Sequence, residues 1–356
     1  MRKRIVVFLV ALFLVAVPLL LAQPKKIVVV GLSADDIQEL QKANPNVRIV
    51  PGLPPEQAGV TPVTPDAPTA NTQRQELLRE VADADAFIGG PTREVLQAAK
   101  KLKWVQVLSA GVENYQYPEL MNSDIVLTNG KKIASPGIAD HAMAMLLSLT
   151  RKMTHFIAVR PKEEWVRDDY ALLELKGKTA LVIGVGGIGS NVARRAWAFD
   201  MKVIGVDIQQ MNPTPFVERF VYPDRLDEVL PQADVVFMCV PHTPKSEGMM
   251  GPGQFKLMKK GSYFIAVSRG KTYSLNGLVE ALDSKRLAGA GVDVTDPEPL
   301  PKGHALWKFD NVIITPHIAT QGDGEIPRRM VMIQENVARF ANGEQLINVV
   351  NKREGF

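Results

Sequence analysis

Short apolar runs alternate with amphipathic stretches along most of the chain. Apolar runs of strand length occur at residues 26–31, 47–50, 86–89, 104–108, 125–128, 180–183, 203–206, 234–240, 263–267, 288–294 and 311–315. Stretches with apolar residues at helical spacing separate these runs, at residues 35–43, 72–82, 93–100, 135–153, 226–230, 254–258, 276–284 and 328–342. Strands that alternate with helices in this way predict an α/β protein with doubly wound parallel sheets.

Two stretches stand out from this alternation. Residues 51–70 contain many prolines together with glycine and threonine, so we expect a loop there rather than a helix. Residues 135–153 predict a long apolar helix that could link two domains, with Ser135 as its cap and Pro136 in its first turn. The final helix, 328–342, is long enough to return to the first domain.

Glycines are concentrated in residues 180–207, which read ALVIGVGGIGSNVARRAWAFDMKVIGVD. The pattern is that of a strand, a glycine turn, a helix and a second strand. In such a unit the first glycine permits a tight turn, the second lets backbone amides approach a pyrophosphate, and the last lets the helix pack closely on the sheet. The helix N-terminus favours the negative charge. We therefore predict a dinucleotide site at Gly184, Gly186, Gly187, Ile188 and Gly189.

Asp207 ends the second strand of this unit, 18 positions after the last glycine. Its carboxylate would accept hydrogen bonds from the adenosine ribose hydroxyls, and it would repel a 2′-phosphate. The next three residues, Ile208-Gln209-Gln210, supply no cation to hold such a phosphate. The sequence therefore favours NAD over NADP as the cofactor.

The first 22 residues lie outside this α/β pattern. Three basic residues at positions 2–4 precede an apolar stretch, residues 5–21, that ends at Ala22. This pattern is typical of a secretory signal peptide, and its length also suits an uncleaved anchor that contacts the membrane through residues 5–21. Either reading places the rest of the chain outside the cytoplasm, whereas a need for NAD favours the cytoplasm, so the sequence leaves the localisation open.

Charge and cysteine content exclude some other classes of protein. The net charge is +4, but it falls to +1 without the three cations of residues 1–22, and no basic stripe occurs elsewhere, so we expect no nucleic-acid partner. The single cysteine, Cys239, lies in an apolar run and reads as a buried strand residue. One cysteine excludes an intramolecular disulfide and argues against a cysteine-based metal site, and we predict no metal.

Three polar side chains follow the carboxyl ends of predicted strands: Arg269, Glu298 and His317. Such strand ends converge on one crevice beside a bound cofactor. A guanidinium can hold a carboxylate at two points, and an imidazole can take or return a hydroxyl proton. A carboxylate beside the imidazole orients it and favours its protonated form. Hydride transfer between NAD and a 2-hydroxy acid needs this set of groups.

Each of these residues also has a purely structural reading. Arg269 could be a surface cation, Glu298 a solvated loop acid and His317 a hydrogen-bonded turn histidine. Residues 109–113, just past a strand end, read either as a ligand-binding loop or as an ordinary turn between strand and helix. His242 follows another strand and could line the crevice without taking part in the chemistry.

The motifs of the second half resemble those of the D-isomer-specific 2-hydroxyacid dehydrogenases. The similarity spans most of residues 135–319, with weaker agreement at residues 109–115. The motifs that carry it are Phe255-x-x-Met258-Lys259-x-Gly261, Ser268-Arg269-Gly270, the run 289–301 and Pro316-His317-Ile318-Ala319, in this order.

This resemblance implies a role for each matching residue. Arg269 would bind the substrate carboxylate and carbonyl, His317 would be the acid/base, and Glu298 would be the partner of His317. Asp293 would face the nicotinamide carboxamide. Further implied contacts to the cofactor are Val240, Pro241, Thr243 and Val267, and implied contacts to the substrate are Ala110, Gly111 and Val112.

The resemblance also implies a domain organisation. Two Rossmann-like doubly wound domains are expected, with the cofactor domain, residues 133–318, inserted into a smaller flavodoxin-like substrate domain. The substrate domain would combine residues 24–132 with residues 319–356. A homodimer is implied, built partly through the long helix and the arm that follows it.

Some positions depart from the common pattern of that family. Ala266 stands where asparagine is common, and Ser268 where alanine is common. Glu113 replaces a frequent aspartate, and Asp140 a frequent glutamate. The three strand-end residues are kept, but the differences in the first domain leave the substrate open.

Two classes of function compete for this sequence. The first is an NAD-dependent enzyme that interconverts a D-2-hydroxy acid and its 2-oxo acid. The alternative is an NAD(H)-sensing binding protein of the same fold without turnover. Retention of Arg269, Glu298 and His317 favours the enzyme.

Overall fold

The computed structural model describes residues 23–354, except for residues 54–67, 166, 168–169 and 210–213. The signal or anchor segment predicted at residues 1–22, and its membrane contact, lie outside the described residues. Among the helices of the described part, none is both long and apolar enough to cross a bilayer.

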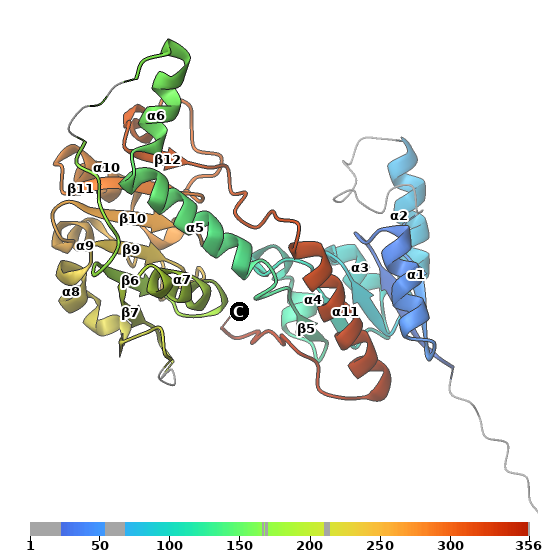
Figure 1. The fold of residues 1–356 in the computed structure, drawn as a ribbon. Helices are drawn as coiled ribbons and strands as arrows, with labels where there is room; N and C mark the ends of the chain where they lie inside the picture. The colour runs from blue at the N-terminus through green and yellow to red at the C-terminus, as the bar shows by residue number, and fades with distance from the viewer. Residues whose placement is uncertain (1–22, 54–67, 166, 168–169, 210–213, 355–356) are drawn as a thin grey trace, which may run out of the picture.

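The chain forms two parallel sheets in two lobes (Figure 1), which confirms the α/β prediction. The first sheet has the order β2-β1-β3-β4-β5 and the second the order β12-β11-β10-β9-β6-β7-β8. The first is made of β1 (Lys25–Val29), β2 (Val47–Pro51), β3 (Ala86–Ile88), β4 (Trp104–Gln106) and β5 (Val126–Thr128). The second is made of β6 (Thr179–Ile183), β7 (Lys202–Val206), β8 (Arg219–Val221), β9 (Val235–Met238), β10 (Ser262–Ala266), β11 (Leu287–Val292) and β12 (Val312–Ile314).

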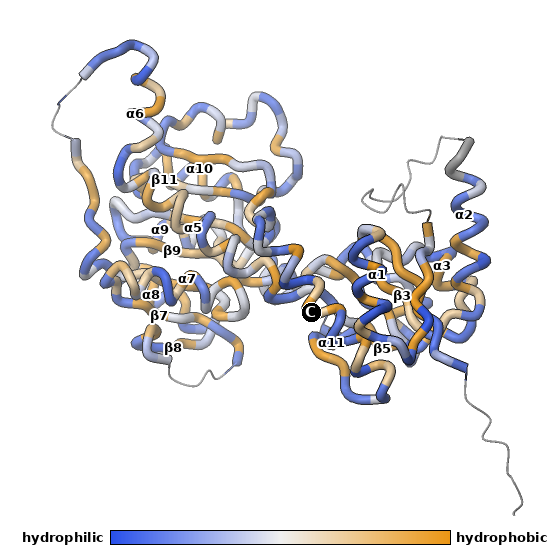
Figure 2. The backbone as a smooth tube through the Cα atoms, turned by 45° about the vertical axis from the view of Figure 1, so that its right-hand side comes forward, coloured by the Kyte–Doolittle hydropathy of each residue, from blue (hydrophilic) through white to orange (hydrophobic). Residues whose placement is uncertain are grey.

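Helices cover both faces of each sheet, because the apolar strands run through the middle of each lobe and need cover on both sides (Figure 2). On the first sheet, one face packs under α1 (Ala34–Ala43) and α11 (Glu325–Asn342), and the other under α2 (Pro68–Val81), α3 (Arg93–Ala98) and α4 (Pro118–Met121). On the second sheet, α5 (Ser135–Thr150) and α7 (Gly187–Ala198) cover one face, and α8 (Leu226–Val229), α9 (Pro252–Leu257) and α10 (Leu275–Asp283) the other.

The end of the chain completes the first lobe. Ile333 and Val337 of α11 are fully buried against the first sheet. The buried Asn336 side chain donates to Gln106 Oε1 at 2.9 Å and accepts from the Ile347 amide at 2.8 Å. Residues 348–350 then pair with β5, where Val349 and Thr128 form an antiparallel bridge. The returning helix expected from the sequence therefore belongs to the core of the first lobe.

The order of the second sheet fixes where a ligand can bind. From β6 the chain adds β7 and β8 on one side, then crosses back to add β9, β10, β11 and β12 on the other, so the strand order reverses between β6 and β9. A crevice forms at the carboxyl ends of the strands at such a switch point. The loop from β6 to α7, which carries the glycines, opens into this crevice.

Four details differ from the sequence prediction. The long helix predicted at residues 135–153 ends at Thr150, because Lys152 adopts a left-handed backbone (φ 55°), and a separate helix, α6 (Met153–Val159), follows. Apolar residues continue across the break between α5 and α6, so the hydrophobic pattern alone did not reveal where α5 ends. Ser135 is not the cap of α5: Ala134 holds that position without a side-chain bond, and Ser135 is buried.

The other two differences concern element boundaries. α2 begins at Pro68, inside the segment predicted to be a loop, since proline is compatible with the first turn of a helix. The strand β8 was not predicted, because its three residues, Arg219–Val221, are too few to show a pattern.

Candidate active site

The glycine turn between β6 and α7 has the geometry that its sequence predicts. Gly184 has a φ of 85°, and a Cβ there would lie 2.7 Å from the Val240 side chain. A Cβ on Gly189 would overlap the Gly184 carbonyl group, so the helix can approach the turn only with glycine at this position. No atom lies within 4 Å of the place that a Cβ on Gly186 would occupy. The backbone is therefore open at the point where a pyrophosphate would meet the N-terminus of α7.

Asp207, at the end of β7, reaches back to this turn. Its Oδ2 accepts a hydrogen bond from the Val185 amide at 2.8 Å, and its Oδ1 accepts one from the Gln209 amide at 3.0 Å. A carboxylate has more lone pairs than these two bonds use, so acceptor capacity remains for ribose hydroxyls. The turn and the acid together fit a dinucleotide.

The other residues expected around the cofactor follow neighbouring strands. After β9, the Ser246 hydroxyl donates to the Pro241 carbonyl at 2.6 Å, and the Thr243 amide donates to Ser246 Oγ at 2.8 Å, which fixes this loop. Val240 packs against Gly184, and Val267 is buried directly after β10. The four predicted cofactor contacts lie at the carboxyl edge of the sheet, on the side of the glycine turn: Val240, Pro241, Thr243 and Val267.

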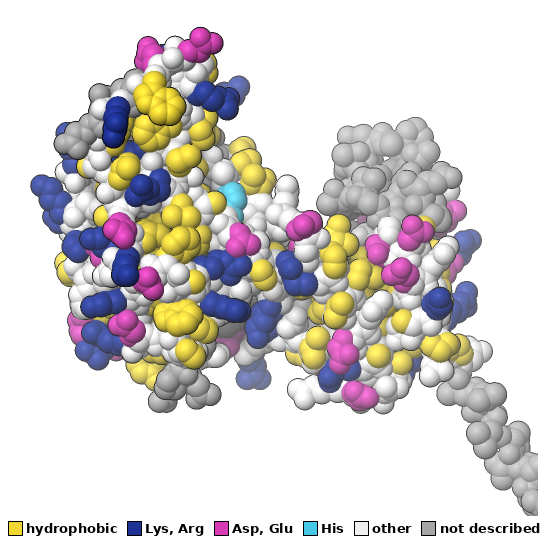
Figure 3. Space-filling model, viewed as in Figure 1, with side chains coloured by type: hydrophobic (Ala, Val, Ile, Leu, Met, Phe, Trp, Pro, Cys, Tyr) yellow, Lys and Arg dark blue, Asp and Glu magenta, His cyan; other side chains and the backbone are white. Residues whose placement is uncertain are grey.

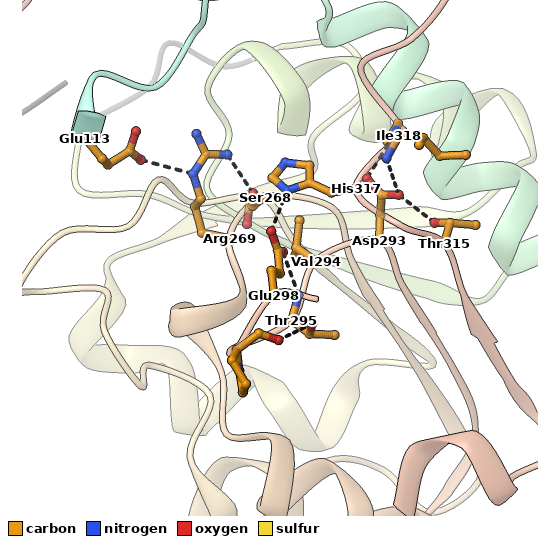
Figure 4. Close-up of polar contacts among 12 residues, drawn as sticks. Glu113, Ser268, Arg269, Asp293, Val294, Thr295, Glu298, Thr315, His317 and Ile318 are labelled. Carbon is orange, nitrogen blue, oxygen red and sulfur yellow. Dashed lines mark hydrogen bonds and ion pairs between the residues drawn. The ribbon is translucent and has the colours of Figure 1, made fainter. Parts of the chain in front are cut away.

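Asp293, directly after β11, organises the loop that carries His317. It is 2% exposed. One oxygen, Oδ1, accepts hydrogen bonds from the Thr315 hydroxyl at 2.6 Å and the Ile318 amide at 3.0 Å, and Oδ2 accepts from the Ala319 amide at 3.0 Å. The nicotinamide contact implied for this residue stays a prediction, while the observed bonds assign it a further task of holding the loop 315–319 (Figure 4).

His317 is held on both its backbone and its side chain. Its φ is 54°, a conformation that costs a residue other than glycine on the order of 1 kcal/mol. Its amide donates to the Asp293 carbonyl at 2.8 Å, and its Nδ1 lies 2.8 Å from Glu298 Oε2. The other Glu298 oxygen accepts from the Thr295 amide at 2.9 Å. Because a carboxylate only accepts hydrogen bonds, Nδ1 carries the proton in this pair and Nε2 is left for a substrate.

Arg269 follows β10 and is oriented by two acceptors. Its Nη1 donates to the Ser268 carbonyl at 2.9 Å, and its Nε donates to Glu113 Oε1 at 3.0 Å. Glu113 belongs to the other lobe, so this ion pair crosses between the two sheets (Figure 4). A Cβ on Gly111 would overlap both Arg269 Nη2 and the Glu113 carboxylate, so the predicted substrate loop reaches the guanidinium.

The charge state of Glu113 follows from this contact. Burial raises the pKa of its carboxyl group, but the Arg269 guanidinium and the local backbone outweigh that effect, and the net pKa lies below its usual value. His242, when protonated, acts in the same direction. Glu113 is therefore an ionised carboxylate at neutral pH.

Most sequence-predicted site residues lie along two facing strand edges. From the second sheet come the glycine turn, Asp207, the loops after β9 and β10, Asp293, Glu298 and His317. From the first sheet comes the loop that follows β4, in which Gly111 meets Arg269, Val112 is buried and the Ala110 carbonyl accepts from Asn129 at 2.6 Å.

Three participants were not predicted from the sequence. Glu113 was placed in the possible ligand-binding loop 109–113 without a role of its own, and its pairing with Arg269 joins positions 156 residues apart, which no local signal reveals. Thr315 bridges Asp293 and His141, whose Nε2 lies 2.9 Å from the threonine hydroxyl. Thr295 holds Glu298 through a backbone amide, a group that any sequence would provide.

The fold and these residues define a class of protein. An open dinucleotide turn, an acid/base pair and a guanidinium at one sheet edge describe a nicotinamide-dependent oxidoreductase of the doubly wound class. The set contains no metal-ligand cluster among the described residues.

Comparison with known proteins identifies the family. Residues 143–319 match the model for "D-isomer specific 2-hydroxyacid dehydrogenase, NAD binding domain". A glyoxylate reductase of Thermofilum pendens is 32% identical over 78% of this chain and 85% of its own length. A D-3-phosphoglycerate dehydrogenase of Methanocaldococcus jannaschii is also 32% identical, but this chain spans only 54% of that protein.

A solved structure agrees. A D-isomer specific 2-hydroxyacid dehydrogenase family protein of Aeromonas salmonicida superposes with a TM-score of 0.74, at 26% identity, over 92% of this chain and 99% of the other. The chain therefore belongs to the D-isomer specific 2-hydroxyacid dehydrogenase family. It is a dehydrogenase or reductase of that family and uses NAD or NADP.

Proposed function

We propose that the protein reduces a 2-oxo acid to the D-2-hydroxy acid with NADH, or catalyses the reverse reaction. The observation that carries this proposal is the pair of His317 Nδ1 and Glu298 Oε2, 2.8 Å apart, at the sheet edge that also presents Arg269. An acid/base and a carboxylate-binding cation are the two groups that this reaction requires from the protein.

Each residue of the site has a separate role in the proposed reaction. A nicotinamide cofactor, when bound at the glycine turn, would supply the hydride-transfer chemistry for C2 of the substrate. The Arg269 guanidinium binds the substrate carboxylate and polarises the carbonyl, with the backbone amides of Gly111 and Val112 beside it. His317 Nε2 gives a proton to the carbonyl oxygen during reduction and takes it back during oxidation. Glu298 keeps the imidazole in the right tautomer and favours its protonated form.

We propose NAD rather than NADP as the cofactor. Asp207 is already fixed by the Val185 and Gln209 amides, so its negative charge stays where a 2′-phosphate would lie. Asp207→Ala should weaken NADH binding by about tenfold and narrow the preference over NADPH. Titration of each cofactor, followed by nicotinamide fluorescence, measures both effects. Unchanged affinity for both would contradict the assignment.

We also propose the domain boundaries of the chain and its oligomeric state. Residues 133–318 act as the cofactor domain, and residues 24–132 with 319–356 as the substrate domain. A homodimer is supported by α6 and the arm after it, where Ile157 and Trp165 are 60% and 96% exposed. A single protomer would leave these apolar side chains in water. Light scattering of the purified protein tests this point.

The central experiment measures NADH oxidation by the chain without residues 1–22. Glyoxylate, hydroxypyruvate, pyruvate and larger 2-oxo acids form the panel. His317→Asn should lower kcat by orders of magnitude with NADH affinity nearly unchanged, because the side chain touches the substrate rather than the glycine turn. Undiminished turnover in this variant rules out the mechanism. NADH binding by the parent protein without turnover on the whole panel would instead favour the NAD(H)-sensing binding protein.

A further inference from the structure

The turn before α5 holds a lysine in an unusual backbone conformation. Residues 129–134 connect β5 to α5, at the crossing from the first lobe to the second (Figure 1). The Ile133 amide donates to the Gly130 carbonyl at 3.3 Å, which closes a turn whose third residue is Lys132. The φ of Lys132 is 74°, and glycine or asparagine is the usual residue at such a position. The backbone of Lys132 is therefore strained, and strained residues are concentrated at ligand sites.

The end of a helix does not account for this strain. A left-handed residue is common just after a helix. Four other residues with positive φ follow a helix directly or after one intervening residue: Lys152, Glu163, Asp200 and Lys285. Lys132 instead precedes α5, so its conformation belongs to the turn itself.

This turn is fastened to the predicted substrate loop of the first lobe. The Gly130 amide donates to the Ser109 carbonyl at 2.8 Å, and Asn129 Nδ2 donates to the Ala110 carbonyl at 2.6 Å. A Cβ on Gly130 would overlap the Leu108 carbonyl group, so the turn and the loop are in direct contact. The first lobe therefore sets the position from which the lysine side chain extends.

The Lys132 side chain packs on the start of α7, in the second lobe. A Cβ on Gly187, the first residue of α7, would lie 3.0 Å from Lys132 Cγ and 3.4 Å from Lys132 Cα. Lys132 thus occupies the space that a side chain on Gly187 would take. Two methylene groups separate Cγ from Nζ, so the ammonium group can reach an anion bound at the N-terminus of α7.

The charge of Lys132 is available to such an anion. Its side chain is exposed. In the described part of the chain, the lysines that form ion pairs are others: Lys26, Lys103, Lys176 and Lys259. The glycine turn itself, residues 184–189, contains no cationic side chain and offers only backbone amides and the helix dipole. A lysine ammonium is a compact charge that suits a phosphate.

We propose that Lys132 binds the pyrophosphate of the dinucleotide, so that a cation from the first lobe holds the cofactor together with the glycine turn of the second lobe. The strain at Lys132 is then the cost of placing a positive charge where the turn has none. This inference rests on the dinucleotide site that the proposed reaction uses. It does not depend on the substrate or on the choice between NAD and NADP, because both cofactors contain the pyrophosphate.

Binding measurements on the purified protein test this role without turnover. Nicotinamide fluorescence follows NADH, and calorimetry follows ADP-ribose and adenosine. Lys132→Met keeps most of the aliphatic side chain and removes the charge. We expect the Kd values for NADH and ADP-ribose to rise by about tenfold, and the Kd for adenosine, which has no phosphate, to stay the same. The difference between the variant and the parent protein should narrow as salt is added.

Two variants control for the charge. Lys132→Arg keeps a cation at this position, so its affinity for ADP-ribose should stay within about threefold of that of the parent protein. Lys176→Met makes the same change in net charge as Lys132→Met. Lys176 precedes β6, whereas the glycine turn follows β6, so it lies at the opposite edge of the sheet. Its affinity for NADH should equal that of the parent protein.

A third variant separates binding from folding. Lys132→Gly removes the charge and also suits the positive φ, so its Tm should equal or exceed that of the parent protein while its Kd for NADH rises as in Lys132→Met. A fall in Tm that accompanies the loss of affinity would indicate a merely structural residue and overturn the inference.

The ligand comparison gives the other decisive outcomes. An ADP-ribose affinity in Lys132→Met equal to that of the parent protein overturns the inference, and so does an equal loss of affinity for ADP-ribose and adenosine. A parent protein that binds NADH but reduces no 2-oxo acid instead refutes the proposed reaction. In that case the ADP-ribose comparison still decides the role of Lys132.

Discussion

The two ends of the site, the proposed acid/base end at His317 and the proposed carboxylate-binding end at Arg269, are built in different ways. His317 is held by Asp293, Glu298, Thr295 and Thr315, all of which belong to loops of the seven-stranded sheet. Arg269 follows a strand of the same sheet, but its guanidinium is oriented by Glu113 from the five-stranded sheet. One lobe therefore orients His317, the proposed proton-transfer group, by itself, whereas Arg269, the proposed substrate anchor, is fully oriented only when the lobes meet.

The face of the molecule drawn in Figure 3 shows no comparable contrast in charge between the two lobes. On the face in Figure 3, acidic and basic side chains are interspersed over both lobes. The difference between the two ends of the site lies in the local contacts of His317 and Arg269.

The largest expected effect comes from the point where the two ends touch. Gly270 follows Arg269, and a Cβ there would overlap the Thr295 carbonyl group, which belongs to the loop that bears Glu298. Gly270→Ala should lower kcat/KM by about a hundredfold or more, because it separates the anchor from the acid/base pair. Steady-state kinetics measures the loss, and circular dichroism confirms that the variant is folded. Gly253→Ala is the control, because no atom lies within 4 Å of its added Cβ. Its kcat/KM should stay close to that of the parent protein.

A smaller effect is expected within the acid/base end alone. Asp293→Ala removes three hydrogen bonds to the loop 315–319 and leaves the amides of Ile318 and Ala319 without their acceptors. We expect the free energy of unfolding to fall by about 2–4 kcal/mol and kcat to fall by about tenfold. Urea denaturation and kinetics measure the two. Equal losses of kcat and of substrate affinity would contradict a role confined to His317, because substrate binding depends on Arg269.

The smallest effect concerns the contact between the lobes. The pKa of Glu113 lies below its usual value of 4.5, because Arg269 outweighs the effect of burial. A carboxyl group whose pKa is lower in the folded state contributes stability above its unfolded pKa, and that contribution is lost as the pH falls through the folded pKa. The free energy of unfolding of the parent should thus exceed that of Glu113→Gln by less than about 1 kcal/mol at pH 7. Urea titrations at a series of pH values should show this difference disappear below the pH range in which carboxyl groups usually titrate. A difference that persists to about pH 3 would contradict the lowered pKa of Glu113.

The same division explains what could be predicted from the sequence. In the second lobe, Arg269, Glu298 and His317 each lie in the loop that follows an apolar strand, so the sequence alone could assign them to one edge. The glycine turn and Asp207 have a fixed spacing, which made them recognisable. These signals are local, and the physics behind them acts within a few residues.

Contacts between distant segments were not predictable in this way. Three such contacts are the Arg269 and Glu113 pair, the link from His141 through Thr315 to Asp293, and the bond from Asn336 to Gln106. Each joins residues far apart in sequence, and no pattern in either segment indicates its partner. The break between α5 and α6 depends on the backbone of one residue, Lys152, inside a continuous apolar pattern. Periodicity reports which face is buried, and it does not report where a helix stops or what it meets.

The return of the chain to the first lobe has a consequence for how the protein acquires its shape. Lys25 in β1 donates to the Phe340 carbonyl across 315 residues, and the core beneath β1 includes Ile333 and Val337. During synthesis this face of the first sheet is therefore covered by α1 alone until α11, residues 325–342, has been made. The second lobe, which is continuous in sequence, has all its parts earlier. The lobe that is made first should therefore be the one that folds last. Its completion requires closing a long loop between β1 and α11, and this closure should be the slowest step in the folding of the nascent chain.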